Sequence, residues 1–216
     1  MVSFLIVTYF RSDLVARFFA RMAEQSLPHE FVVVDNDSDI STRNTLKSIV
    51  GLRKNINVHY NTVNIGFGPA CNMATEHAGG NVFVFTQPDV ILLEDVAAKV
   101  RDTVIDGVLY GHQLHTGDTG WNKFGNEVFP YLNGHFLACT RNTWNAIGGF
   151  DPRYWPIDYE DVDLSVTASR AGILLRTIDV KIQHDTGAHW RHGSREATTQ
   201  ANKILFAEKW NLNGPD

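Results

Sequence analysis

Two adjacent carboxylates, Glu160 and Asp161, stand where a helix is predicted to begin. The helix is predicted from apolar residues that recur at helical spacing, namely Leu164, Ala168 and Ala171, with Gly172 as its stop. An aromatic, proline-containing loop over residues 154–159 precedes it. A carboxylate on a rigid helix that faces such a loop is suited to take a proton from a bound hydroxyl. The alternative is that these acids, with Asp163, only interact favourably with the helix N-terminus.

A candidate metal site lies at Asp89, which follows a hydrophobic strand and precedes Val90. One carboxylate there could hold a Mg²⁺ or Mn²⁺ ion that bridges two phosphates. His184 closes another predicted strand and is a candidate second ligand, because imidazole binds manganese. A hydrogen-bonded structural histidine is the alternative interpretation of His184.

The segment 185–195 is rich in positive and titratable side chains, among them His189, Arg191, His192 and Arg195. We expect a loop that closes over the site and neutralises a leaving diphosphate through its arginines. A solvated surface loop is the other interpretation.

The elements that would position these residues alternate in type along the first half of the chain. Strands are predicted over 2–7, 31–34, 56–60 and 82–86. Helices are predicted over 13–25 (with Ser12 as its cap), 41–50, 69–78 and 93–104. Four alternations with short connections predict a parallel sheet with helices on both faces, which is an α/β, Rossmann-like fold class.

Polar residues follow each of these strands, at the edge where an open parallel sheet binds ligands. They are Thr8 and Tyr9, then Asp35, Asn36 and Asp37, then residues 61–64, and finally Thr86, Gln87 and Asp89. Any one of them is an ordinary turn residue, but four polar strand ends on one edge indicate a binding rim. The stretch Asn64-Ile65-Gly66-Phe67-Gly68, followed by Asn72, could allow a phosphate to approach a helix N-terminus. A plain turn before a helix is equally consistent with it.

The second half of the chain has a mixed pattern. Strands are predicted over 108–113 and 135–140, separated by a polar and aromatic loop over 114–133. A short helix over 142–147, the helix that begins at Glu160, a strand pair within 173–182 and a last helix over 196–210 follow. We predict one α/β domain over 1–216, with a first half over 1–106 and a mixed second half over 107–216.

The bulk composition narrows the possible partners. The net charge of −5 argues against a nucleic-acid backbone as the main ligand. The longest apolar stretches are strand-sized and too short to cross a bilayer, and no secretory leader is visible, so we expect a soluble, cytoplasmic protein.

Cys71 and Cys139 lie in apolar settings and are interpreted as packed thiols.

Taken together, these segments resemble the family-2 glycosyltransferases of the GT-A fold over nearly the whole chain, and their rhamnosyltransferase-like branch in particular. The matching segments occur in the family's order: residues 6–9, 33–38, 64–67 with 70–72, 87–89, 148–151, 159–164, His184 and 209–210. The resemblance implies an inverting transfer of a hexose or deoxyhexose from a UDP- or dTDP-sugar to a hydroxyl of a glycan. It further implies a role in polysaccharide biosynthesis. Residues 1–106 would then be the nucleotide-sugar-binding half and residues 107–216 the acceptor and catalytic half.

The resemblance also implies a role for each matching position. Asp161 would be the catalytic base and Glu160 its acceptor-orienting neighbour. Asp89 would be the last acid of the family's DXD motif and would bind Mn²⁺ or Mg²⁺ together with His184. Gln87 stands where many members carry an acid or asparagine, which weakens this motif. The donor would contact Thr8, Tyr9, Asp35, Asp37, Asn64, Gly66, Asn72, Gln87, Arg191 and Arg195, and the acceptor would contact Trp121, Trp155, Tyr159 and Glu160.

Two other functions remain open from the sequence. A non-catalytic nucleotide-sugar-binding module of a larger polysaccharide synthase would also need the donor residues, but the Glu160–Asp161 pair argues against it. A nucleotidyltransferase would be expected to have a glycine-rich, basic loop after the first strand, and residues 8–13 offer little of that.

Overall fold

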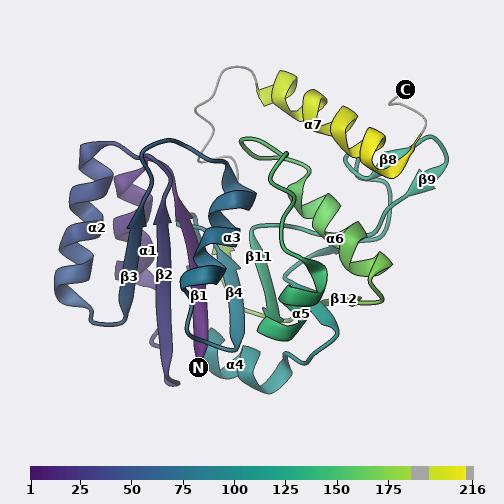
Figure 1. Cartoon of the computed structure of the whole chain (residues 1–216). Helices are drawn as coiled ribbons and strands as arrows, with labels where there is room; N and C mark the ends of the chain where they lie inside the picture. The colour runs from purple at the N-terminus through teal and green to yellow at the C-terminus, as the bar shows by residue number, and fades with distance from the viewer. Residues whose placement is uncertain (186–194, 213–216) are drawn as a thin grey trace.

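The computed structural model describes residues 1–185 and 195–212 and is built on one seven-stranded sheet (Figure 1). Strands β1 (Val2–Thr8), β2 (His29–Asp35), β3 (Ile56–Tyr60) and β4 (Val82–Thr86) run parallel to one another. Strand β11 (Phe136–Thr140) lies antiparallel between β4 and β6 (Val108–Gly111), and β12 (Leu174–Thr177) pairs in parallel with β6. The strand order is β12-β6-β11-β4-β1-β2-β3. The expected α/β fold with a mostly parallel sheet is confirmed.

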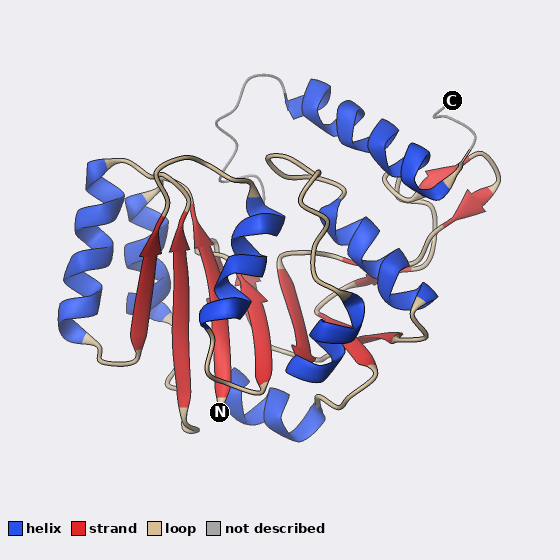
Figure 2. Cartoon of the chain, in the orientation of Figure 1, coloured by secondary structure: helices blue, strands red, loops and turns tan. Residues whose placement is uncertain are grey.

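Helices cover both faces of this sheet (Figure 2). Alternate residues of β1 show why: Phe4 and Ile6 pack on one face, and Leu5 and Val7 on the other. The first face is covered by α1 (Ser12–Arg21), α2 (Ile40–Leu52) and α4 (Val96–Thr103). The second is covered by α3 (Phe67–His77), α5 (Arg141–Ile147) and α6 (Glu160–Arg170). Because both faces are buried, the central strands are apolar throughout.

Several predicted boundaries differ from the structure. Helix α1 ends at Arg21 rather than Gln25, because the Gln25 amide instead donates to the carbonyl oxygens of Ala23 and Glu94. Ser12 does not cap it, since the preceding Arg11 is in the left-handed conformation and makes no side-chain cap. Helix α4 begins only at Val96, because residues 90–92 form strand β5 (Val90–Leu92). The predicted strand pair within 173–182 is also wrong: β12 pairs with β6, whereas β13 (Ile182–His184) pairs with β5.

The predicted loop 114–133 contains short strands. Strand β7 (Leu114–His115) pairs with β10 (Tyr131–Leu132), and β8 (Lys123–Phe124) pairs with β9 (Glu127–Val128). Two-residue strands carry too little periodicity to be recognised in a sequence. The segment is held by packing instead, because Phe124 stacks on Phe206 of α7 (Arg195–Trp210) at 5.0 Å between ring centroids.

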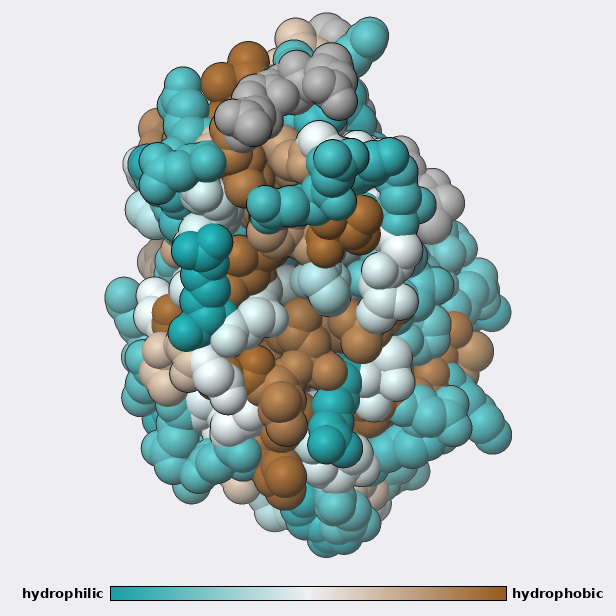
Figure 3. All heavy atoms as spheres, turned by 90° about the vertical axis from the view of Figure 1, so that its right-hand side faces the viewer, coloured by the Kyte–Doolittle hydropathy of each residue, from teal (hydrophilic) through white to brown (hydrophobic). Residues whose placement is uncertain are grey.

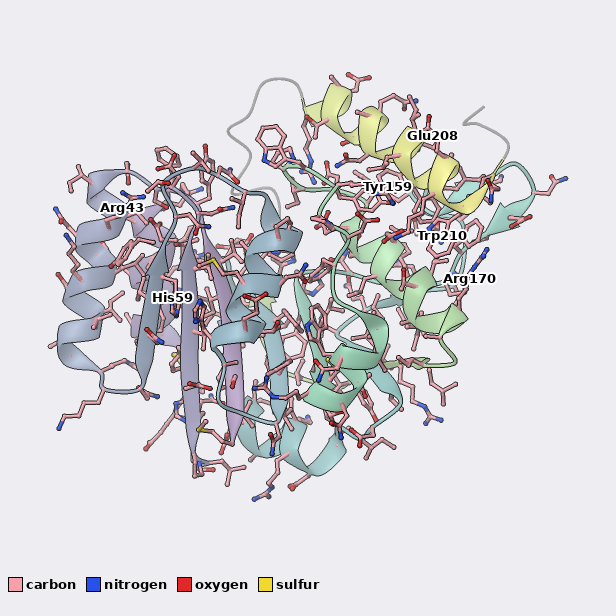
Figure 4. All side chains as sticks on the ribbon, viewed as in Figure 1. Arg43, His59, Tyr159, Arg170, Glu208 and Trp210 are labelled. Atoms are coloured by element: carbon pink, nitrogen blue, oxygen red, sulfur yellow. The ribbon has the colours of Figure 1, made fainter. Side chains whose placement is uncertain are left out.

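Helix α7 lies against α6 through a small aromatic core, separate from the two cores that flank the sheet (Figure 4). Its members are Phe124, Tyr131, Tyr154, Tyr159, Val162, Val166, Phe206 and Ala207. At its edge the guanidinium of Arg170 lies 4.5 Å from the ring centroid of Trp210, a cation–π contact between the two helices. The last helix therefore belongs to the same packed structure as the loop 114–133.

Asp163 is the polar centre of this contact between α6 and α7. Its Oδ2 accepts from Lys209 Nζ at 2.7 Å, and its Oδ1 accepts from Trp210 Nε1 at 3.0 Å and from Tyr154 Oη at 3.1 Å. Lys209 also binds Asp151 at 2.9 Å. Because Asp163 is 1 % exposed, its charge depends on these three donors for compensation.

The molecular surface on the side of α6 and β12 carries apolar area between hydrophilic flanks (Figure 3). Exposed apolar residues of the elements on this side include Leu174 of β12 and Val128 of β9.

Cys71 and Cys139 are buried free thiols, as expected. Within the described ranges, no helix has the length and apolarity needed to cross a membrane.

We predict that Asp163→Ala lowers the free energy of unfolding by about 3 kcal/mol, because it leaves Lys209, Trp210 and Tyr154 without their shared acceptor. Urea denaturation followed by tryptophan fluorescence measures this. Asp102→Ala is the control, since Asp102 forms an exposed ion pair with Arg101 and is expected to change stability by less than about 0.5 kcal/mol. Equal losses in the two variants would contradict the role of Asp163.

Candidate active site

A cavity of about 380 Å³ opens at the carboxyl ends of the central strands, between the sheet and the start of α6. It brings together a majority of the side chains that the sequence singled out: Tyr9, Asn64, Gln87, Asp89, Trp121, Tyr159, Glu160, Asp161, His184 and Arg195. The cavity lining does not include Thr8, Asp35, Asp37, Gly66, Asn72 or Trp155. Arg191 lies outside the described residues.

The two adjacent carboxyl groups at the start of α6 have different surroundings. Asp161 Oδ2 accepts from the backbone N–H of Gly134 at 2.8 Å, and its Oδ1 accepts from the N–H of Val162 at 2.8 Å. Burial raises the pKa of Asp161 to about 6, against the opposing effect of these two N–H donors.

Glu160 is 4 % exposed, and its Oε2 has no hydrogen-bond partner in the described part of the chain. Burial, and secondly the neighbouring Asp161, raise the pKa of Glu160 well above its usual value. Burial therefore disfavours the charged form more strongly at Glu160 than at Asp161. Of the two carboxyl groups in this cavity, Asp161 is the better suited to accept a proton and Glu160 to hold one.

Asp89 and His184 converge on the opposite part of the lining. Strands β5 and β13 pair Val90 with His184, which brings His184 Nε2 to 3.6 Å from Asp89 Oδ2. No cluster of three or more His, Cys, Asp or Glu side chains suited to a metal occurs among the residues that the structure describes. One carboxylate and one imidazole still fit Mn²⁺ or Mg²⁺, because such ions take much of their coordination from substrate phosphates and water.

A second histidine, His135, lies against His184. The two rings stack at 4.4 Å between centroids and 18° between planes. Burial, together with His184 and His112, lowers the pKa of His135 to about 3, so its ring is neutral. His135 was not predicted from the sequence, because its role depends on strand β11 running beside the end of β13.

The acidic residues after β2 are engaged by an arginine, labelled in Figure 4. Arg43 Nε donates to Asp35 Oδ2 at 2.9 Å, and its Nη2 donates to the carbonyl oxygen of Asn61 at 2.7 Å. Thr8 Oγ1 donates to the other oxygen of Asp35 at 3.2 Å. Asp37 keeps a 3.4 Å ion pair with Arg43 and is half-exposed. In this structure the Thr8–Asp35 pair holds Arg43 and the strand ends in place.

Asn36 ties the end of β2 to the loop after β3. Its Nδ2 donates to Asn64 Oδ1 at 2.7 Å and to the Gly66 carbonyl oxygen at 3.1 Å, while its Oδ1 accepts from the N–H of Ile65 at 3.0 Å. Gly66 has φ +92°, and a Cβ there would lie 3.1 Å from Trp155. Trp155 in turn donates from Nε1 to the carbonyl oxygen of Asn64 at 3.2 Å. Gly66 and Trp155 thus shape this loop from outside the cavity.

Asn72 lies away from the cavity and supports the loop before α6. Its Oδ1 accepts from the N–H of Phe150 at 2.9 Å, and its Nδ2 donates to the Phe150 carbonyl oxygen at 2.8 Å. These two bonds occupy both ends of the amide. The Asn72 side chain therefore connects α3 to the Gly149–Phe150 segment, and it does not line the cavity that contains Asp161 and Asp89.

Arg195, at the start of α7, forms a two-point ion pair with Asp158. Its Nη2 and Nε lie 2.9 and 3.2 Å from the two carboxylate oxygens, and Thr199 adds a hydrogen bond of 2.7 Å. Asp158 and Tyr159 both have left-handed backbone angles, φ 82° and 73°. Tyr159 is buried, and its ring centroid lies 5.8 Å from that of Trp121. Helix α7 thereby holds the strained turn that precedes Glu160.

The fold indicates the class of protein to which this chain belongs. A mostly parallel sheet with one antiparallel strand and helices on both faces is the α/β fold of the GT-A glycosyltransferases. The family model described as "Glycosyl transferase family 2" matches residues 3–162, and the chain belongs to this family.

Solved structures share the fold at low sequence identity. A mannosyltransferase from Pyrobaculum calidifontis, in complex with GDP-Man and Mn²⁺, aligns with a TM-score of 0.65 and 20 % identity over 82 % of this chain and 54 % of that one. S. aureus TarS 1–349 with UDP-GlcNAc aligns at 0.62 and 17 % over 96 % and 66 %. GalNAc-T7 with UDP, GalNAc and Mn²⁺ aligns at 0.69 and 13 % over 96 % and 47 %. The chain thus spans about half to two thirds of their lengths. No curated protein matches it.

Proposed function

We propose that this chain is an inverting, metal-dependent glycosyltransferase that moves a hexose or deoxyhexose from a nucleotide-diphosphate sugar to a hydroxyl of a glycan. The proposal rests on one observation. A single cavity at the carboxyl ends of the strands contains an ionised carboxylate on a helix N-terminus, Asp161, and a carboxylate–imidazole pair, Asp89 with His184. Base and metal ligands in one cavity are what sugar transfer from a diphosphate requires.

In the proposed mechanism Asp161 removes the proton of the acceptor hydroxyl as its oxygen attacks the anomeric carbon. The attack comes from the face opposite the diphosphate, so the bond to the diphosphate breaks with its electron pair and the configuration inverts. Glu160, protonated, donates a hydrogen bond that orients the acceptor. Trp121 and Tyr159 offer stacking surfaces for a sugar ring.

The donor would lie between the strand ends and α6. Tyr9, Asn64 and Gln87 line that part of the cavity. Asp89 and His184 would hold a Mn²⁺ or Mg²⁺ ion, which supplies positive charge to the leaving diphosphate when bound. Arg195 could add to that charge only by loosening its ion pair with Asp158. The resemblance favours a UDP- or dTDP-sugar and the rhamnosyltransferase-like branch, with residues 1–216 as one domain.

A donor screen tests the proposal. The protein with Mn²⁺ or Mg²⁺ is incubated with UDP-, dTDP- and GDP-sugars, and release of the nucleotide is measured. We expect release from one donor class, even slowly, with water as acceptor. Calorimetric binding without release would favour a non-catalytic sugar-nucleotide module, and neither binding nor release would refute the transferase assignment.

We predict that Asp161→Asn lowers the transfer rate by about 10²–10⁴-fold, because an amide cannot accept the proton. Donor affinity should be unchanged. In the unaltered protein kcat/KM should rise about tenfold per pH unit up to pH 6 and level off above it, since only ionised Asp161 is active and its pKa is about 6.

Asp102→Asn, an exposed change in α4, is the matched control for this substitution and should keep full activity. Retained turnover in Asp161→Asn, or a rate that falls as the pH rises from 5 to 7, would exclude Asp161 as the base.

We also predict that Asp89→Ala removes the metal dependence of nucleotide binding. Titration calorimetry with UDP, dTDP or GDP should give the same affinity with and without Mn²⁺ in the variant and a tighter complex with Mn²⁺ in the unaltered protein. A matched change at the exposed carboxylate Asp106 should leave the metal effect intact. Unchanged metal-dependent affinity in Asp89→Ala would show that the metal ligands lie elsewhere.

A further inference from the structure

Residues 133–135, just before β11, contact both functional groups of the cavity. At one end, the backbone N–H of Gly134 donates to Asp161 Oδ2 at 2.8 Å. The approach is close, because a Cβ added to Gly134 would lie 3.2 Å from Asp161 Cβ and 3.3 Å from Oδ2. Only glycine leaves the Asp161 carboxylate in this position without a shift of a few tenths of an ångström.

At the other end, the ring of His135 covers the ring of His184. The stacking distance of 4.4 Å and the 18° angle leave the His184 imidazole one packed face. His135 itself is 5 % exposed and held at both nitrogens: Nδ1 lies 2.7 Å from Asn133 Oδ1, and Nε2 lies 3.2 Å from His112 Nδ1. The Asn133 oxygen can only accept, so Nδ1 carries the proton and Nε2 accepts from His112.

We propose that Asn133, Gly134 and His135 form a positioning segment that sets the base Asp161 and the metal ligand His184 in a fixed relation to each other. This inference rests on the proposed function. Gly134 acts on Asp161 through its N–H, and His135 acts on His184 through the flat face of its ring. Asn133 and His112 keep the His135 ring from turning.

The physical reason for this role of His135 is the conformational entropy that the His184 side chain loses when it binds a metal. An imidazole that rotates freely must lose that freedom when it binds a metal, whereas a stacked ring is already oriented. The side chain of His184 is a quarter exposed and its Nε2 lies 3.6 Å from Asp89, and the stack on His135 restrains the plane of its ring. Groups that orient a metal ligand typically contribute 10–100-fold to metal affinity.

Two apolar variants separate the ring face from the ring nitrogens. His135→Leu and His135→Phe both remove the hydrogen bonds to Asn133 and His112, but only phenylalanine keeps a flat ring against His184. Mn²⁺ affinity in the presence of UDP, dTDP or GDP is measured by calorimetry and by the electron paramagnetic resonance signal of bound Mn²⁺. We expect about tenfold weaker Mn²⁺ binding for His135→Leu and a change of less than about threefold for His135→Phe.

His77→Ala is the control, because His77 stacks on His59 at 3.7 Å in the region of β3 and α3 outside the cavity lining. It should bind Mn²⁺ as the unaltered protein does, which shows that loss of a stacked histidine elsewhere has no such effect. Melting temperatures of all variants establish that each is folded under the assay conditions.

Gly134→Ala tests the other end of the segment. It should lower kcat by about tenfold through displacement of Asp161, while Mn²⁺ and nucleotide affinity stay unchanged. Equal Mn²⁺ affinity in His135→Leu and the unaltered protein, or equal weakening in the Leu and Phe variants, would overturn the positioning role of the ring. If the unaltered protein binds no Mn²⁺ with any nucleotide, the proposed metal-dependent function fails instead, so the two failures are distinguishable.

Discussion

The buried carboxylate of Asp163 is the interaction on which the site end of the molecule depends. It sits on α6 between the sheet-side core and the aromatic core, and it receives donors from the last helix and from the loop before α6. A carboxylate with 1 % exposure is stable only if its donors are in place. The position of α7 and the position of α6 are therefore set together, although Asp163 lies 46 residues before Lys209 and 47 before Trp210.

The same pairing of helices explains the conformation of the turn that leads into α6. A left-handed backbone conformation at a non-glycine residue costs about 1–2 kcal/mol. Asp158 and Tyr159 are two consecutive residues in this conformation. Helix α7 offsets this cost. Arg195 and Thr199 bind the Asp158 carboxylate, and Asn202 donates to the carbonyl oxygens of Ile157 and Asp158. The turn places Glu160 and Asp161 at the cavity, so the orientation of these acids depends on a helix that begins 34 residues later.

The sequence was sufficient for the main elements of the first half of the fold, and a majority of the site residues predicted from it line the cavity. Buried parallel strands are apolar runs with polar ends, and both signals are strong at β1, β2 and β4. The short strands around residues 114–132 could not be found, because their pairing depends on packing against α7. His135 was missed for a related reason: it acts through a ring contact with a segment distant in sequence, and its residue type does not signal this locally. Asn36 was expected at the rim, but its hydrogen bonds to the loop after β3 could not be read from the sequence.

The polar residues at this edge of the sheet are of two kinds. Some face the cavity, and others are hydrogen-bonded within the protein and fix the segments around the cavity. Asp35 is fully buried, and its oxygens receive Arg43, Thr8 and the N–H of Ser38, so its charge is already satisfied within the protein. Glu160 is also buried, but among the described residues its Oε2 has no donor, and burial raises the pKa of Glu160 well above its usual value. A buried carboxyl group that accepts hydrogen bonds from the protein is stabilised in its charged form and has a structural role. A buried carboxyl group without such donors is favoured in its neutral form and remains available to a ligand. Both side chains carry a carboxyl group, and the surrounding hydrogen-bond donors decide which of the two roles that group has.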